Sequence, residues 1–231
     1  MTNILAIDTS TEACSVALMF NNELSSDFAI SQRDHTKQIL PMIDNLLKAA
    51  NCPLSQIDAI AFAKGPGSFT GVRIGIGIAQ GLALGLDKPM IGVSTLKALA
   101  QGAYRVKGAS RIITAIDARM GEVYLGAYQV TDEGNVQLMM EECVIKPELV
   151  SNHLASFSFT ENITYYAGTG WSTYPDMMIG LKDGGTLLPK AEDMLIIAKQ
   201  EYINGNLIAV QDVEAAYLRN EVTWKKLPGR E

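Results

Sequence analysis

The chain has 231 residues, of which 48% are hydrophobic and 20 are glycine, a composition that suits a compact α/β protein with ample core. Its formal net charge is −6, which disfavours tight binding of tRNA or DNA by this chain alone, because such binding surfaces are basic. The three cysteines, Cys14, Cys52 and Cys143, share no CxxC spacing, so neither a disulfide framework nor a cysteine metal site is expected.

The N-terminal segment predicts no export signal. Residues 1–8 have no basic region and reach an acid, Asp8, at once, so we expect no signal peptide. The longest apolar run lies in a glycine-rich segment that ends at Gly85; it is interrupted by Arg73 and Gln80 and is expected to be too short to cross a bilayer. These features predict a soluble cytoplasmic protein that does not contact membranes.

The first elements predict antiparallel strands joined by a polar turn. Residues 4–8 are expected to form a buried strand, followed by strands at 14–20 and 24–30 with a hairpin turn at residues 21–22. Asp8 ends the first strand, and Thr9 and Ser10 follow it. Backbone N–H groups in such a turn can form an anion-binding nest, so Asp8, Thr9 and Ser10 are candidate phosphate-binding residues. The alternative is that the hydroxyl groups only close a hairpin.

Residues 35–50 have the apolar spacing of an amphipathic helix. Pro41 is expected to bend this helix or to split off its first turn. The apolar stripe is wide and includes Met42, so we expect it to cover more than the chain's own sheet. His35 has no serine or cysteine nucleophile at a recognisable spacing, and a structural role is the simpler interpretation.

A glycine-rich helix follows a predicted strand at 59–63 and a break at residues 65–67. Ser68 or Thr70 is a candidate cap for this helix. Small residues recur every four positions along it and form two stripes, because such positions share a helix face. The first stripe contains Gly71, Gly75, Ala79 and Ala83, and the second contains Gly77, Gly81 and Gly85. One stripe is expected to press on the sheet, and the other is free to accept a ligand or a helix of another chain; alternatively, both serve internal packing.

The second half repeats the opening pattern of strand, acid and hairpin. After a strand at 90–93, a cap at residues 94–95 and a helix at 96–104, a strand at 111–117 ends in Asp117. Further strands are expected at 122–130, 136–144 and 163–167, and helices at 147–154 and 190–202; residues 171–185 are irregular. Gly168 and Gly170 lie in a loop that a ligand could approach. We predict an N-terminal lobe at 1–104 and a C-terminal lobe at 105–231, with the helix at 190–204 packing back towards the first lobe.

Four segments, at 4–10, 65–85, 116–124 and 217–219, together resemble the TsaB (YeaZ) family over essentially the whole chain. The resemblance implies a two-lobed actin-like ATPase (ASKHA) fold with duplicated mixed-sheet lobes. It also implies a non-catalytic role in making threonylcarbamoyladenosine next to the anticodon of tRNAs that read codons starting with A. The implied partners are the catalytic paralogue TsaD and the ATPase TsaE, with TsaC acting upstream and tRNA reached only through the complex.

The same resemblance bears on metal and nucleotide binding. The paralogue's Gly-Val-His-His-x-x-x-His segment corresponds to residues 92–99 here, and Thr95 and Leu99 stand at the two ligand histidine positions. Leucine cannot ligate a metal and hydroxyl groups replace imidazole poorly, so no metal site and no catalytic residue is expected. ATP or ADP, magnesium and the catalytic metal are expected on partner subunits. The candidate remnants of a phosphate site are then Asp8, Thr9 and Ser10 after the first strand, together with Asp117, Gly168 and Gly170 in the second half.

The second glycine stripe and the apolar stripe of residues 35–50 are expected to face outward together. They would meet two helices of TsaD in a four-helix bundle, or pair with a second copy of this chain as a homodimer. The predicted partner-binding residues are His35, Gln38, Ile39, Met42, Arg73, Ile74, Gly77, Ile78, Gly81, Leu84 and Gly85.

Two other functions compete with this interpretation. One is a stand-alone ATPase or small-molecule kinase that uses Asp8, Thr9 and Asp117 around a nucleotide with magnesium. The other is a peptidase, for which the sequence offers no Ser-His-Asp set and no zinc motif. The locally basic tail at 217–230 is either a solvated terminus or a docking or phosphate-proximal strand.

Overall fold

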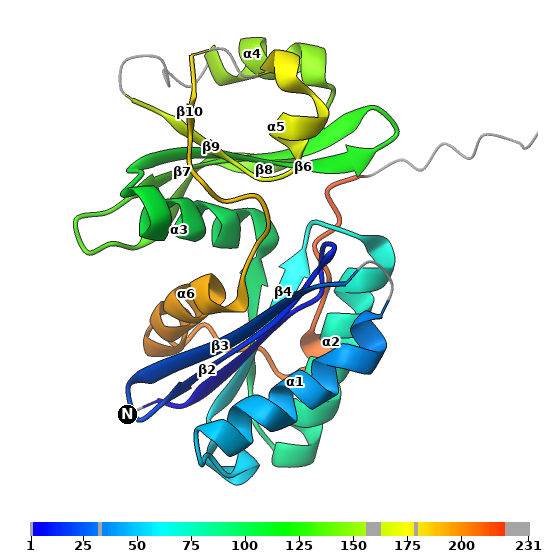
Figure 1. Cartoon of the computed structure of the whole chain (residues 1–231), viewed down its shortest axis with the longest axis vertical. Helices are drawn as coiled ribbons and strands as arrows, with labels where there is room; N and C mark the ends of the chain where they lie inside the picture. Colours follow the sequence, from blue (N-terminus) through cyan, green and yellow to red (C-terminus); the bar gives the residue numbers. More distant parts are fainter. Residues whose placement is uncertain (1, 32–33, 156–162, 178–179, 220–231) are drawn as a thin grey trace, which may run out of the picture.

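The computed structural model describes residues 2–31, 34–155, 163–177 and 180–219. Within these residues the chain forms two lobes, each built on a five-stranded mixed sheet with helices on both faces (Figure 1). The part of the basic tail at 220–230 lies outside the described residues. The predicted α/β architecture with duplicated mixed-sheet lobes is confirmed.

The two sheets have the same topology. The first has the strand order β3-β2-β1-β4-β5, and the second has β8-β7-β6-β9-β10 when read in the matching direction. In both, the first three strands of the lobe pair antiparallel, the fourth pairs parallel with the first, and the fifth pairs parallel with the fourth. The first sheet contains β1 (Ile4–Asp8), β2 (Ala13–Phe20), β3 (Glu23–Ile30), β4 (Ala59–Gly65) and β5 (Met90–Ser94). The second contains β6 (Arg111–Arg119), β7 (Glu122–Val130), β8 (Val136–Ile145), β9 (Tyr165–Ala167) and β10 (Lys182–Asp183).

Alternating side chains of the first sheet fill two separate core layers, as expected for a sheet covered on both faces. Leu5 and Ile7 of β1 pack with α1 (His35–Ala49) and α2 (Phe69–Leu86). Ile4 and Ala6 pack on the opposite face with α6 (Ala191–Ile203). Figure 1 shows these helices on the two sides of the sheet. The predicted helix and strand boundaries in this lobe agree with the structure to within two residues, except that the helix predicted at 96–104 continues to Lys107.

The second sheet is covered by α3 (Thr95–Lys107) on one face and by α4 (Pro147–Ala155) and α5 (Gly170–Thr173) on the other (Figure 1). β9 is shorter than the predicted strand at 163–167. The segment at 171–185 is more regular than predicted, because most of α5, a 3₁₀ turn (Pro175–Met177) and β10 occupy it. β10 pairs with β9, which gives backbone groups in this segment hydrogen-bond partners.

Helices α3 and α6 join the lobes. Leu96 and Leu99 of α3 cluster with the second sheet, whereas α6 packs on the first. Arg105 of α3 forms a bidentate ion pair with the fully buried Asp193 of α6, at 2.8 and 3.1 Å. A boundary at residue 104 therefore divides a helix that belongs to both lobes. After α6, the C-terminal segment continues through a 3₁₀ turn (Val210–Asp212) along α2 and β4 towards the second lobe. A separate 3₁₀ turn (Leu54–Gln56) precedes β4 in the first lobe.

The local signals in the first lobe have direct structural explanations. Ser68 Oγ accepts the N–H of Gly71 at the start of α2, and Ser94 Oγ accepts that of Lys97 at the start of α3. Helix α1 runs continuously through Pro41, so the predicted separation of its first turn is wrong. Helix α2 has 18 residues with a mean hydropathy of 1.4, so length and composition alone do not exclude a membrane span. It packs on the first sheet through one face, a position that explains its apolar composition equally well.

Candidate functional site

The turn after β1 is closed. Asp8, Thr9, Ser10 and Thr11 are each at most 7% exposed. Thr9 Oγ1 donates to Gly71 O at 2.7 Å, and Ser68 N donates to Ser10 O at 2.7 Å, so the first turn of α2 lies directly on this turn. Thr95 Oγ1 also donates to Ser10 Oγ, at 3.2 Å. The polar groups that the sequence predicted at this turn are brought together, but they are used within the protein.

Glycines at the start of α2 make this close approach possible. A Cβ atom at Gly71 would lie 2.1 Å from Thr9 O, and one at Gly67 would lie 2.3 Å from Ser10 O. A Cβ atom at Gly75 would lie 2.7 Å from Thr9 Oγ1. Each distance is shorter than a van der Waals contact, so a side chain at any of these positions would push α2 off the turn. The first glycine stripe is therefore an internal packing stripe, as predicted.

The Asp8 carboxyl group is held in an unfavourable environment. Its Oδ1 accepts the N–H of Ser10 at 2.7 Å, while Oδ2 is buried and has no hydrogen-bond partner among the described residues. Burial raises the pKa of Asp8 from 3.8 to about 6, although the hydrogen bonds from Ser10 and the nearby charge of His35 act in the opposite direction. A charged carboxylate at this position is therefore costly to the fold.

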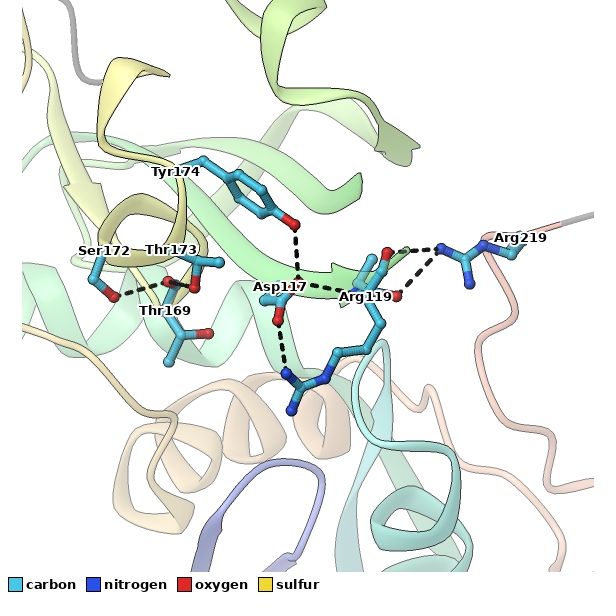
Figure 2. A network of polar contacts seen from close by, with 8 residues as sticks. Asp117, Arg119, Thr169, Ser172, Thr173, Tyr174 and Arg219 are labelled. Atoms are coloured by element: carbon cyan, nitrogen blue, oxygen red, sulfur yellow. Dashed lines mark hydrogen bonds and ion pairs between the residues drawn. The ribbon is translucent and has the colours of Figure 1, made fainter. Parts of the chain in front are cut away.

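The corresponding turn after β6 is open to solvent. Asp117 Oδ1 accepts the N–H of Arg119 at 2.9 Å, and Oδ2 pairs with the Arg119 guanidinium at 3.0 Å. Arg119 and Met120 have positive φ angles of 62° and 58°, and their side chains are exposed. Figure 2 shows the Arg119 guanidinium beside Asp117 and the Tyr174 hydroxyl directed at the same carboxylate.

Arg219 of the C-terminal segment holds this second turn from outside. Its Nη2 donates to Ala118 O at 3.2 Å and to Glu122 Oε2 at 2.6 Å (Figure 2 shows the contacts to the turn). Two residues earlier, the Tyr217 hydroxyl accepts a hydrogen bond from the Arg73 guanidinium of α2. The segment thus connects α2 with the second lobe, a connection that the sequence analysis missed because the tail has no periodic pattern.

The loop with Gly168 and Gly170 packs on its own lobe. Both glycines are buried, and a Cβ atom at Gly168 would lie 2.3 Å from Ala115 O. A Cβ atom at Gly170 would lie 2.9 Å from the carbonyl carbon of the same residue. Close approach to β6 therefore explains these two glycines. In Figure 2, the Ser172 and Thr173 hydroxyls point towards Thr169, and both donate to its carbonyl oxygen.

The two positions aligned with the paralogue's ligand histidines lie in the interior. Thr95 and Leu99 are both fully buried, and Leu99 packs with Ile112, Ile116 and Ala167. Among residues 2–31, 34–155, 163–177 and 180–219, no three or more histidine, cysteine, aspartate or glutamate side chains are grouped so that they could hold a metal ion.

The second glycine stripe of α2 lies on the surface. Gly77, Gly81 and Gly85 are exposed, and a Cβ atom at each would meet nothing within 4 Å. Leu84, which lies beside them, is 72% exposed. Arg73 is exposed at the start of the helix, while Ile74, Ile78 and Gln38 are half-buried. The outer face of α2, defined here by Gly77, Gly81, Leu84 and Gly85, is thus smooth, apolar and accessible.

The predicted contribution of α1 to this surface needs correction. Ile39 is fully buried, and Met42 is only 7% exposed, because both pack in the core between α1 and the first sheet. His35 is also buried and hydrogen-bonds through Nε2 to Thr11 O at 2.9 Å. These three residues are therefore structural, and the wide apolar stripe of α1 faces inward. Leu40, which was not among the predicted partner-binding residues, is a large apolar residue of α1 that is 50% exposed.

Comparisons with known proteins agree with the resemblance described above. The family model described as "TsaD: tRNA N6-adenosine threonylcarbamoyltransferase" matches residues 27–205. The chain is 53% identical to the tRNA threonylcarbamoyladenosine biosynthesis protein TsaB of Escherichia coli, over 99% of both chains. It is 46% identical to the protein of the same name from Haemophilus influenzae, over 99% of this chain and 98% of the other.

A solved structure of the same family also resembles this chain. The structure of YeaZ from Pseudomonas aeruginosa superposes with a TM-score of 0.87 at 44% identity, covering 94% of this chain and all of that one. The two lobes with matching topology are accordingly an actin-like fold. With matches that span nearly its whole length, the chain belongs to the TsaD family as that model defines it, and within it to the TsaB (YeaZ) group.

Proposed function

We propose that this chain is a non-catalytic scaffold subunit for threonylcarbamoyladenosine synthesis on tRNA in the cytoplasm. It binds a TsaD-type transferase through the outer face of α2, and the ATPase TsaE joins the pair. The threonylcarbamoyl donor comes from TsaC, and tRNA is bound by the assembled complex. Nucleotide, magnesium and the catalytic metal belong to the partner subunits.

The observation that carries this proposal is the accessible glycine stripe. Each helical glycine costs about 0.5–1 kcal/mol relative to alanine, and among the described residues nothing lies within 4 Å of a Cβ atom placed at Gly77, Gly81 or Gly85. The same helix uses its other glycines for close packing against residues 8–11. By the same physical logic, the outer stripe is suited to the close approach of a helix from another chain.

The state of the two turns favours a scaffold over the alternative ATPase or kinase. Thr9 and Ser10 are buried and engaged with the start of α2, and the glycines at 168 and 170 pack on β6. Asp8 is buried with a raised pKa, so it is poorly suited to hold a magnesium ion. Only the turn at 117–121 presents its acid near solvent.

Self-association follows from the same surface. A symmetric pair places the same patch of each copy against the other, and a smooth apolar helix face can serve in such a pair. We therefore propose a homodimer that competes with the TsaD-type partner for the outer face of α2. Dissociation of the homodimer then precedes assembly of the complex.

Gly81→Leu tests the proposed interface. The new side chain enters open space, so the variant should fold, but it would separate the two helix backbones. We expect binding to the TsaD-type partner, measured by calorimetry, to weaken by about tenfold or more, and self-association in sedimentation to be lost.

Lys199→Leu is the matched control, since it adds the same side chain at an exposed position of α6, on the opposite face of the sheet. It should bind the partner as the unmodified chain does. Normal partner binding by Gly81→Leu would place the interface elsewhere, and unfolding of that variant would mean that the stripe packs internally.

A further inference from the structure

A pocket of about 390 Å³ opens between the two lobes, away from the outer face of α2. Its first-lobe wall comes from the ends of β4 and β5, with Lys64 and Ser94. Its second-lobe wall comes from β7 and β8, with Tyr128 and Glu142, and α6 contributes a third side. Groups from both lobes therefore surround one space.

Glu142 in the lining of this pocket is held by hydrogen bonds to one of its carboxylate oxygens. The Ser94 hydroxyl and the Tyr128 hydroxyl both donate to Glu142 Oε1, the latter at 2.5 Å. Burial, together with the adjacent carboxylate, raises the pKa of Tyr128 far above its usual value, so this phenol remains a donor. Within the part of the chain that the structure describes, no group donates to Oε2. One carboxylate oxygen of a rigidly placed side chain is thus free to accept.

Lys64 provides the opposite charge. Its side chain is half-buried in the pocket lining, yet it forms no ion pair with any described carboxylate. By contrast, Lys97 on another side of the pocket pairs with Glu201 at 3.4 Å. The Lys64 ammonium group can therefore pair with the carboxylate of a ligand that enters the pocket.

The overall charge of the lining narrows the class of ligand. Two lysines and three glutamates line the pocket, counting Glu141 as well as the residues above. A polyphosphate would meet an excess of carboxylates, and a simple cation would leave Lys64 unpaired. A small molecule that carries both an ammonium and a carboxylate group satisfies the two sides. Apolar side chains complete the lining, namely Val93, Leu138, Ile197 and Leu218.

We propose that this pocket binds a free α-amino acid with an apolar side chain. The ligand's ammonium group donates to Glu142 Oε2, its carboxylate accepts from Lys64, and its side chain contacts the apolar lining. Because both lobes contribute, an occupied pocket also fixes the lobes relative to each other. This proposal is independent of the proposed function and of the outer face of α2.

Calorimetric titration of the full chain with L-leucine tests the proposal. We expect saturable binding at one site with a Kd below about 1 mM. Lys64→Met should weaken it by about 10- to 100-fold, because a charge-assisted hydrogen bond is lost. Lys88→Met, which removes another half-buried lysine of the same lobe outside the pocket, should leave the affinity unchanged.

Ligand analogues identify the two contacts separately. N-acetyl-L-leucine lacks the ammonium group and L-leucinamide lacks the carboxylate, so each should bind at least about tenfold more weakly than L-leucine. Three results would overturn the proposal: no binding of L-leucine at about 10 mM, unchanged affinity in a folded Lys64→Met variant, or equal affinity for the N-acetylated analogue.

Discussion

The turns after β1 and β6 begin from the same sequence pattern and end in opposite states. Each follows a buried strand that terminates near an aspartate, and each leads into an antiparallel strand. Asp8 is 1% exposed beneath the start of α2, whereas the second turn carries exposed residues at 119 and 120 and is contacted by Arg219 and by Tyr174. The difference therefore lies in what packs on each turn.

This comparison shows how a duplicated fold can lose symmetry at two equivalent turns. In the first lobe, glycines bring the backbone of a helix within hydrogen-bond distance of the turn. In the second lobe, Gly168 and Gly170 bring a loop against β6, and residues 119 and 120 of the turn stay exposed. The predictions below either force the first turn open or loosen the second.

Gly71→Ala should have the largest effect, because it breaks the closed turn directly. The added Cβ atom would lie 2.1 Å from Thr9 O, a backbone atom that cannot rotate away. We expect the free energy of unfolding, measured by denaturant titration, to fall by about 3 kcal/mol or more.

Gly77→Ala is its control in the same helix. Its Cβ atom meets nothing within 4 Å, so helix propensity alone should raise the free energy of unfolding by about 0.5–1 kcal/mol. If Gly71→Ala were stabilising as well, the close contact between α2 and the first turn would be refuted.

Asp8→Asn should remove a pH dependence of stability that originates in the first turn. Because the pKa of Asp8 is raised to about 6 in the folded state, the folded protein binds this proton more tightly than the unfolded chain. The unmodified protein should therefore lose stability relative to Asp8→Asn as the pH rises from about 4 to above 6. A two-unit shift corresponds to about 3 kcal/mol.

Thermal or denaturant unfolding at pH 4 and pH 8 measures the difference in the free energy of unfolding between the unmodified protein and Asp8→Asn. The difference at pH 4 serves as the internal reference. A stability difference that stays constant with pH, or that changes in the opposite direction, would contradict the description of Asp8 as a poorly solvated acid.

Arg219→Ala should have a smaller effect, confined to the second turn. The variant loses the ion pair with Glu122 and the hydrogen bonds to the carbonyl groups of the turn. In this ion pair the Arg219 side chain is 20% exposed and the Glu122 side chain is 28% exposed. We expect a loss of about 1 kcal/mol and faster amide exchange at residues 117–121. Arg119→Ala removes an 87% exposed side chain and should change stability by less than about 0.5 kcal/mol. Equal effects of the two substitutions would mean that Arg219 does not hold the turn.

Periodicity and turn chemistry were sufficient to predict most of the fold. The strand at 4–8, the capped helices after Ser68 and Ser94, and the repeated strand-acid-hairpin pattern all have strong local signals. The apolar stripe of α1 was predicted to face outward, but it faces the core. The width of an apolar stripe does not reveal how much of it a single sheet can cover.

The candidate site was predictable only on α2, where a single helix carries the pattern. The four-residue spacing of glycines identified both stripes of α2, including the one that is accessible. The pocket between the lobes could not be predicted, since Lys64 and Glu142 are 78 positions apart and meet only through the packing of two sheets. The same holds for Arg219, which reaches residues about 100 positions earlier in the chain.

Titration of the isolated full chain with ATP and magnesium, by calorimetry with a parallel assay for hydrolysis, tests the central claim most directly. A closed first turn and a buried Asp8 leave no complete phosphate site between the lobes, so the account predicts neither saturable binding nor turnover. Binding with a micromolar Kd together with steady hydrolysis of ATP would contradict it and would favour the alternative of a stand-alone ATPase or kinase.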